Sequence, residues 1–175
     1  MRIPKFPALL SLLILAAAPS IAEATNIEGL KVSVGDTLGQ VREAYQTTRE
    51  PEPVRSAGVK TATSLRLKTK GVWFFFDQDT IYTIRLEAPF AGSVNGLRIG
   101  DSEAKMREAL GKPVKLIKPI GGDDGPRNYI YHLDDITTAN VEVNPDNEVE
   151  TIFLVRPTSR SLTPARPLFD AEPLN

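Results

Sequence analysis

Apolar residues recur at helical spacing in two places along the chain and predict two short helices. One apolar stripe runs through residues 38–45 and a second through residues 106–110. Each stripe follows a good capping pair, Asp-Thr at 36–37 and Asp-Ser at 101–102, because their side-chain oxygens accept otherwise unpaired backbone N–H groups. Gly111 is expected to end the second helix.

After each helix the period of apolar residues changes to two, which predicts antiparallel strands. The short segments between the strands are rich in Asp, Asn and Pro, which tight turns favour. The pattern therefore predicts an α+β fold in which each short helix is followed by an antiparallel sheet of about three to four strands. The strands expected are 65–68, 72–76, 81–87, 128–133, 140–143 and 149–155.

The two helix-and-sheet segments resemble each other in sequence. Residues 35–45 and 100–110 align at an offset of 65, and Gly-Asp and Arg-Glu-Ala are identical in both. The hairpin residues 74–86 and 141–154 align in the same order at offsets of 67 and 68. Two matches in one order predict a tandem duplication.

We expect the first repeat to span residues 25–92 and the second to span residues 93–156. A unit of about 65 residues buries only about 60% of the surface of its unfolded chain and is marginally stable alone. The two repeats are therefore expected to pack together as one body.

The N-terminal segment has the layout of a secretory signal peptide. Arg2 and Lys5 precede an apolar run at 8–18, and the small-x-small pattern at 22–24 predicts cleavage after its last residue. An uncleaved membrane anchor is the alternative, but a run of eleven residues, ten of them apolar, is too short for a bilayer core that needs about 20. We expect residues 1–24 to be removed, which places the mature chain in the periplasm or, as second choice, outside the cell.

Residues 157–175 contain four prolines and no hydrophobic period, so we expect a flexible, Pro-rich tail. No apolar run after the signal peptide is long enough to cross a membrane, and no stable membrane insertion is expected.

Composition excludes several kinds of site. The chain has no cysteine, which rules out disulfides, thiolate metal sites, cysteine nucleophiles and a lipid-anchored N-terminal cysteine. A single histidine makes an all-protein zinc site improbable. The 21 basic and 22 acidic residues nearly balance, whereas nucleic-acid-binding proteins usually carry a basic excess. Neither a cofactor nor a metal nor a nucleic-acid partner is therefore expected.

Catalytic candidates are weak. His132 lies at an alternating strand position, and no serine in a nucleophile-elbow setting accompanies it, so we expect a surface or edge histidine rather than a general base. Asp123 and Asp124 lie in a glycine-rich loop that lacks the spaced oxygen ligands of a calcium site, so we expect a solvated loop. The chain is not expected to be an enzyme.

The run Trp73-Phe74-Phe75-Phe76 is the most informative segment. A strand with one helix-covered face should be apolar on one side only, but this strand carries aromatic residues on both. Either the second repeat or the tail covers the outer face, or the outer rings form an exposed strip for protein recognition. The partner-binding candidates are Trp73, Phe75, Arg66, Lys68, Arg85, Tyr129 and Tyr131.

The repeated motif resembles a known family. The second copy, Gly-Leu-Arg-Ile-Gly-Asp-Ser at 96–102 followed by Leu-Gly-Lys-Pro at 110–113, resembles the repeat of the β-lactamase-inhibitor-protein-like (BLIP-like) fold. It is also similar to the SmpA/OmlA lipoprotein subunit of the outer-membrane barrel-assembly machine. The chain departs from both patterns: it lacks the cysteines of these proteins, and Tyr-Gln at 45–46 replaces the expected Leu-Gly. The resemblance implies tandem repeats that present a concave sheet surface to another protein.

These observations together predict a periplasmic protein-binding module that inhibits or regulates another envelope protein, such as a cell-wall hydrolase, a transpeptidase or a β-lactamase. One alternative is an immunity protein that neutralises a toxin delivered to the periplasm. A second alternative is a small-molecule or lipid carrier with an apolar cavity between the sheets.

Overall fold

The computed structural model describes residues 26–54, 61–119 and 125–156. They form one eight-stranded antiparallel sheet, a separate two-stranded sheet, two α-helices and one 3₁₀ turn. The helices and the 3₁₀ turn are α1 (Leu38–Tyr45), α2 (Glu103–Leu110) and η1 (Lys68–Lys70). The two-stranded sheet pairs β1 (Ile27–Glu28) with β6 (Ser93–Val94). In spatial order, the large sheet is β2 (Glu52–Pro53), β3 (Ala62–Leu67), β4 (Val72–Asp77), β5 (Thr80–Glu87), β10 (Val149–Val155), β9 (Thr138–Val143), β8 (Arg127–His132) and β7 (Lys115–Ile117).

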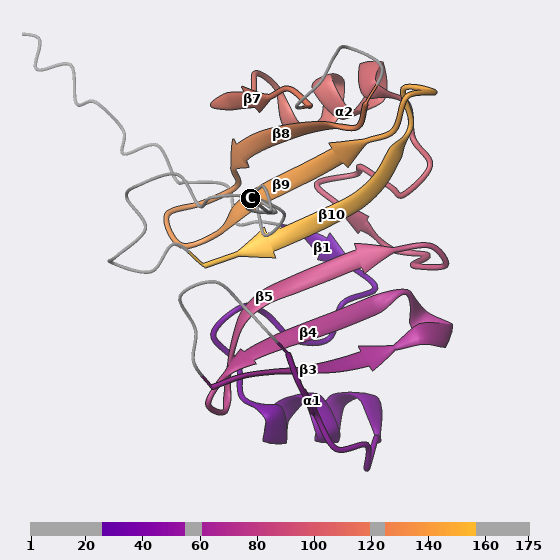
Figure 1. Ribbon diagram of the computed structural model, residues 1–175. Coiled ribbons are helices and arrows are strands. Elements are labelled where there is room, and N and C mark those ends of the chain that lie inside the picture. The colour runs from indigo at the N-terminus through magenta and orange to yellow at the C-terminus, as the bar shows by residue number, and fades with distance from the viewer. Residues whose placement is uncertain (1–25, 55–60, 120–124, 157–175) are drawn as a thin grey trace, which may run out of the picture.

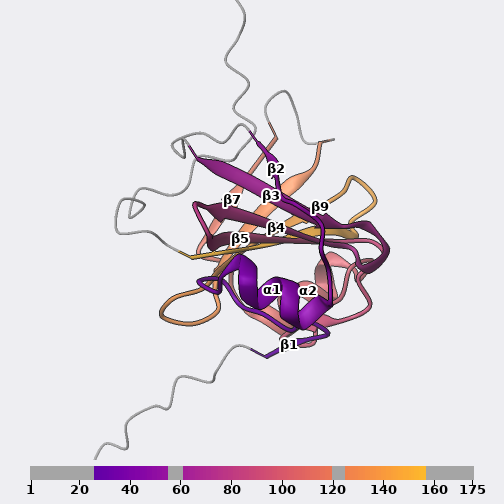
Figure 2. The ribbon, with the colours of Figure 1, turned by 90° about the horizontal axis from the view of Figure 1, so that it is seen from below.

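Both helices lie on the same side of the large sheet, as the view from below shows (Figure 2). The opposite side, which faces the viewer in Figure 1, carries neither helix. We call it the helix-free face. The α+β class expected from the sequence is confirmed. No helix among the described residues is long and apolar enough to span a membrane.

The first and second parts of the chain join edge to edge through β5 and β10. The two strands pair antiparallel over five residue pairs, from Thr151 opposite Glu87 to Val155 opposite Thr83. A single sheet therefore runs through both parts of the chain. The expected signal peptide at 1–24 and the expected tail at 157–175 lie outside the described residues.

The turns that lead into the two helices are held by matching backbone hydrogen bonds. The N–H of Gly35 donates to the carbonyl of Ile81 at 2.8 Å, and the N–H of Gly100 donates to the carbonyl of Val149 at 2.8 Å. Each helix is thereby tied to the second strand of the hairpin that follows it.

The helix caps follow from short polar side chains. Thr37 and its partner Gln40 form a complete capping box, and the Ser102 hydroxyl accepts the N–H of Lys105 at 3.3 Å. Of the two residues considered at each helix start, the hydroxyl residue is thus the cap. The neighbouring Asp36 and Asp101 carboxylates instead accept backbone N–H groups of the preceding turn. Gly111 ends α2 as expected.

The hydrophobic core lies between the helices and the sheet. Phe74, for example, is fully buried, and its ring lies 5.5 Å from the ring of Tyr45 on α1. The largest fully buried side chains are Val41, Phe74, Phe76, Ile81, Ile84, Leu86, Leu97, Met106, Tyr129, Tyr131, Ile152 and Leu154.

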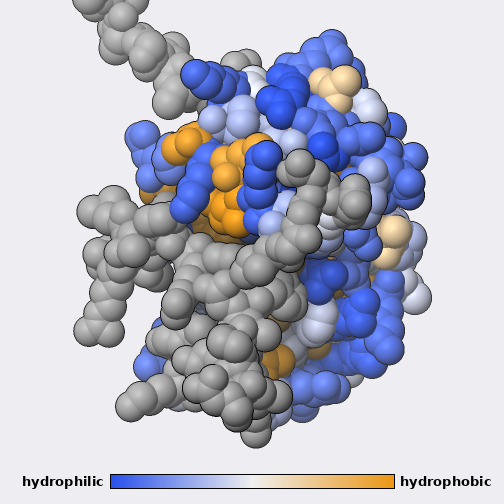
Figure 3. Space-filling view, turned by 45° about the horizontal axis from the view of Figure 1, so that its top comes forward, coloured by the Kyte–Doolittle hydropathy of each residue, from blue (hydrophilic) through white to orange (hydrophobic). Residues whose placement is uncertain are grey.

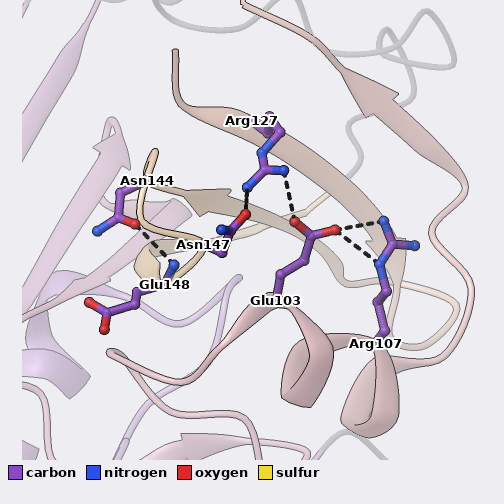
Figure 4. Close-up of polar contacts among 6 residues, drawn as sticks. All are labelled: Glu103, Arg107, Arg127, Asn144, Asn147 and Glu148. Carbon is purple, nitrogen blue, oxygen red and sulfur yellow. Dashed lines mark hydrogen bonds and ion pairs between the residues drawn. The ribbon is translucent and has the colours of Figure 1, made fainter. Parts of the chain in front are cut away.

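An ion-pair cluster fastens the start of α2 to the sheet (Figure 4). The Glu103 carboxylate accepts hydrogen bonds from Arg107 at 2.8 and 3.1 Å and pairs with Arg127 of β8 at 3.1 Å. Arg127 also donates to the side-chain oxygen of Asn147 at 2.5 Å. Burial acts to raise the pKa of Glu103, but hydrogen bonds from Arg107 and Tyr129 and the nearby guanidinium charges outweigh it and hold that pKa below its usual value.

The turn between β9 and β10 presents Asn147 to this cluster. Asn144 Oδ1 accepts the backbone N–H of Glu148 at 2.9 Å across the turn (Figure 4). Asn147 adopts a left-handed conformation with φ of 64°, which asparagine tolerates better than most residues.

Replacing Glu103 by Gln is expected to lower the free energy of unfolding at pH 7 by about 1–2 kcal/mol. Because the pKa of Glu103 is depressed in the folded state, its stabilisation is present above the unfolded-state pKa of about 4.3 and is lost as the pH falls through the folded-state value. Urea unfolding at pH 7 and at pH 3 measures this, and the difference between the two proteins should be smaller at the lower pH. Glu108→Gln, on an exposed carboxylate 3.4 Å from Lys105, is the matched control and should change stability by less than about 0.5 kcal/mol. Equal effects of both substitutions on the free energy of unfolding would contradict a specific stabilising role for the Glu103 carboxylate.

Candidate functional site

An aromatic cluster with two arginines lies on the helix-free face. We call it the aromatic patch and define it by side chains from three neighbouring strands: Arg66 of β3, Trp73 and Phe75 of β4, and Tyr82 and Arg85 of β5. The Trp73 and Phe75 ring centroids are 5.0 Å apart, and those of Phe75 and Tyr82 are 6.4 Å apart. All three rings are partly exposed.

The alternation of β4 explains why both faces of this strand are aromatic. Phe74 and Phe76 point to the helix side and are fully buried, whereas Trp73 and Phe75 point to the helix-free face. Of the two coverings considered for the outer rings, the second half of the chain does not provide one, because β10 continues the sheet beside β5 rather than stacking on it. The tail lies outside the described residues.

Two guanidinium groups hold the indole ring of Trp73. The guanidinium carbon of Arg66 lies 4.8 Å from the Trp73 ring centroid, and that of Arg85 lies 5.7 Å from it. Such cation–π contacts contribute about 0.5–1 kcal/mol each at exposed sites. Glu87 binds both arginines, with a distance of 3.0 Å to Arg85. The carboxylate thus fixes both cations beside the ring and leaves the patch with a net positive charge.

Strand register places one more aromatic residue, Phe153, beside the aromatic patch. Arg66 lies opposite Trp73, Trp73 opposite Arg85, and Arg85 opposite Phe153 of β10. The guanidinium carbon of Arg85 lies 5.5 Å from the Phe153 ring centroid, and Phe153 is 7% exposed.

Part of this site was predicted from the sequence, and the rest was not. Arg66, Trp73, Phe75 and Arg85 were candidates, and the structure brings these four together. Three residues of the site, Tyr82, Glu87 and Phe153, were not predicted from the sequence. Their alternating positions were visible in the sequence, but their proximity depends on the pairing of β5 with β4 and β10.

Three candidates lie elsewhere. Tyr129 and Tyr131 were expected to contact a partner, and this expectation is wrong: both point to the helix side of β8 and are 2% and 1% exposed. Their place is in the core, where the Tyr129 hydroxyl hydrogen-bonds Glu103 and the Arg107 guanidinium lies 5.2 Å from the Tyr129 ring centroid. Lys68 is exposed in η1, after the end of β3, and therefore lies outside the aromatic patch.

Among the described residues, the structure adds no candidate catalytic residue or metal ligand. His132 is the exposed last residue of β8, and its Nδ1 lies 3.4 Å from the Thr138 hydroxyl. Within residues 26–54, 61–119 and 125–156, no three His, Asp or Glu side chains are grouped to hold a metal ion. Asp123 and Asp124 lie outside these ranges.

A second carboxylate lies beside the aromatic patch on the same face. Glu142 of β9 lies opposite Thr151 of β10. Burial raises the pKa of Glu142, the charge of Glu150 raises it further, and Arg85 partly opposes both effects. The ionised form is therefore disfavoured in the folded state.

Replacing Glu142 by Gln is expected to raise the free energy of unfolding at pH 7 by about 0.5–1 kcal/mol. The unfolded chain ionises this group near pH 4.3 and the folded chain only at a higher pH, so the wild type loses stability as the pH rises through that interval. Thermal unfolding between pH 4 and pH 8 measures the difference, which should vanish at the acid end. A Glu142→Gln protein that is less stable than the wild type at pH 7 would refute this prediction. Glu148→Gln, at an exposed carboxylate, serves as the control.

Apolar surface also occurs outside the aromatic patch. Figure 3 shows apolar atoms gathered within a mainly hydrophilic surface. Among the described residues, the large apolar side chains that are most exposed are Val114 at 61%, Ile136 at 54% and Leu116 at 39%. Leu116 belongs to β7, an edge strand of the sheet, and isolated exposures of this kind are ordinary.

Comparison with known proteins adds little to this geometry. No protein-family model matches the chain, and no curated protein matches it in sequence. The structure is weakly similar to that of a DUF4309 family protein (YjgB) from Bacillus subtilis, with 17% sequence identity and a TM-score of 0.40. The match covers 69% of this chain and 78% of the Bacillus protein. A similarity of this size carries no inference about fold or function.

Proposed function

We propose that this protein is a binding module of the cell envelope that recognises another protein through the aromatic patch. The observation that carries the proposal is the pair Trp73 and Phe75, two large rings that remain partly exposed on the helix-free face. Aromatic residues and arginines are enriched among the residues that dominate the binding energy of protein interfaces. Aromatic rings bury large areas with few rotatable bonds. The flexible side chains of Arg66 and Arg85 are already restrained here by Glu87.

The tandem-repeat origin belongs to the same proposal. The sheet order is symmetric about the β5–β10 junction, with β4 and β9, β3 and β8, and β2 and β7 at equivalent positions. The matching hydrogen bonds of Gly35 and Gly100 lie at equivalent points of this order. Together with the aligned sequence segments, these features favour a duplication and support the resemblance to BLIP-like proteins, whose sheets bind other proteins.

The proposed role is inhibition or regulation of another envelope protein, without catalysis by this chain. The signal-peptide pattern at residues 1–24 supports export to the periplasm. The surface offers an arginine-flanked apolar patch, so the partner should present apolar side chains and at least one carboxylate to it.

Affinity capture tests this function. Residues 25–175 are immobilised, and a periplasmic extract is passed over the wild type, over Trp73→Ala/Phe75→Ala, and over the helix-side control Gln46→Ala/Glu108→Ala. A protein retained by the wild type and the control but not by the folded patch variant supports the proposal. Retention of the same proteins by all three would exclude the aromatic patch as the binding site.

A further inference from the structure

A pocket of about 390 Å³ lies at the C-terminal end of α1, away from the aromatic patch. Tyr45, Val72, Pro89 and Phe90 supply its apolar lining. The volume falls within the range of about 300–1,000 Å³ that small-molecule sites occupy. None of the five aromatic-patch residues contributes to its wall.

Tight backbone contacts make the pocket wall rigid. A Cβ at Gly92, which lines the pocket, would lie 1.9 Å from the carbonyl oxygen of Glu28. A Cβ at the neighbouring Gly71 would lie 2.1 Å from the carbonyl oxygen of Glu87. The loop that carries Phe90 is thus pressed between β1 and η1 with no room for side chains at these points. A wall held in this way is preorganised for a ligand.

The pocket lining carries one basic and one acidic side chain. Lys70 lines it, and Lys68 of the same 3₁₀ turn is exposed nearby. Among the described residues, no carboxylate forms an ion pair with Lys68 or Lys70. Glu28 is the acidic residue of the lining, and its carboxylate accepts the Ser93 hydroxyl at 2.8 Å.

The Tyr45 side chain, which lines the pocket, is held in place by contacts with neighbouring residues. Its hydroxyl oxygen accepts the backbone N–H of Lys31 at 3.1 Å. The Lys31 ammonium lies 5.9 Å from the Tyr45 ring centroid and donates to the Ala44 carbonyl at 3.1 Å. The phenol ring therefore has a fixed position in the pocket wall.

We propose that this pocket binds a small organic anion with an apolar body, namely a ring system or short alkyl chain that carries one carboxylate or sulfonate. The apolar body contacts Pro89 and Phe90, and the anionic group pairs with Lys70. This site is independent of the proposed protein-binding function, because the two surfaces share no residue.

The test uses 8-anilinonaphthalene-1-sulfonate as the probe, since it combines fused rings with a single sulfonate. Fluorescence titration of residues 25–175 is expected to show one saturable site. Lys70→Glu should weaken binding at least about tenfold, because it replaces an attractive charge by a repulsive one. Ala91→Trp, at an exposed position of the lining, should also weaken binding by occupying the pocket.

Matched controls separate this site from other surfaces. Lys112→Glu changes an exposed lysine after α2 and should leave the affinity within about twofold. The uncharged analogue N-phenyl-1-naphthylamine should bind at least about tenfold more weakly than the sulfonate. Thermal unfolding confirms that each variant is folded, and amide NMR shifts at Ala91 and Gly92 locate the bound probe.

Equal affinity of wild type and Lys70→Glu would overturn the proposal. So would the absence of saturable binding, or loss of binding only in Trp73→Ala/Phe75→Ala, which would place the probe on the aromatic patch. A failure here leaves the capture experiment unaffected, because that experiment depends on Trp73 and Phe75 alone.

Discussion

Replacing both Trp73 and Phe75 by alanine is expected to weaken binding of the captured partner at least about 100-fold. Truncation of a central aromatic residue at an interface commonly costs 2 kcal/mol or more, which is about 30-fold in the dissociation constant. Trp73 also orders Arg66 and Arg85, whose guanidinium groups lie 4.8 and 5.7 Å from its ring centroid. Its loss therefore removes apolar area and also the cation–π contacts of both guanidinium groups. Isothermal titration calorimetry with the purified partner measures the effect.

The binding experiment also needs a milder variant that keeps an aromatic ring at position 73. Trp73→Phe retains an aromatic ring between the arginines and should lose much less affinity than the double alanine variant. Equal loss in Trp73→Phe and in the double variant would show that the indole itself makes a specific contact. Unchanged affinity of the double variant would remove the aromatic patch from the interface.

Phe74→Ala is expected to lower the free energy of unfolding by about 3–5 kcal/mol. Phe74 is fully buried beneath Tyr45 of α1, so truncation leaves a cavity that the rigid sheet cannot fill. Phe75 is the adjacent residue but points to the helix-free face, and Phe75→Ala should cost less than about 1.5 kcal/mol. Urea unfolding monitored by circular dichroism measures both values.

This neighbouring pair tests the assignment of faces directly. The two substitutions remove the same atoms from adjacent positions of one strand, so composition and strand propensity are matched. Similar destabilisation by both would indicate that the outer face is covered as tightly as the inner one. The slope of unfolding free energy against urea concentration should stay constant if each variant unfolds in two states.

Local patterns were sufficient to predict the two α-helices and the longer strands but not which strands pair with each other. The alternation through Trp73, Phe74 and Phe75 placed these residues correctly on two faces, since strand side chains alternate whatever the tertiary fold. Which face the helices cover depends on packing between residues far apart in the sequence. The same limit explains the error at Tyr129 and Tyr131: their common face was evident, but its burial beneath α2 was not.

The missed contacts have the same physical origin. Phe153 meets Arg85 only because β5 pairs with β10, and no local signal encodes a pairing over more than 60 residues. The edge strands β2 and β7 were not predicted, because two or three residues are too few to show a period. The two helix starts were predicted well, since capping is decided within four residues.

The most direct test of the protein-binding claim is site-specific photo-crosslinking on a folded chain. A benzophenone side chain is placed at exposed Arg66 on the helix-free face, and in a second protein at exposed Glu108 on α2. The account predicts that irradiation in periplasmic extract yields a crosslinked protein from position 66 and that Trp73→Ala/Phe75→Ala abolishes it. A protein that crosslinks from position 108 and not from position 66 would contradict the account.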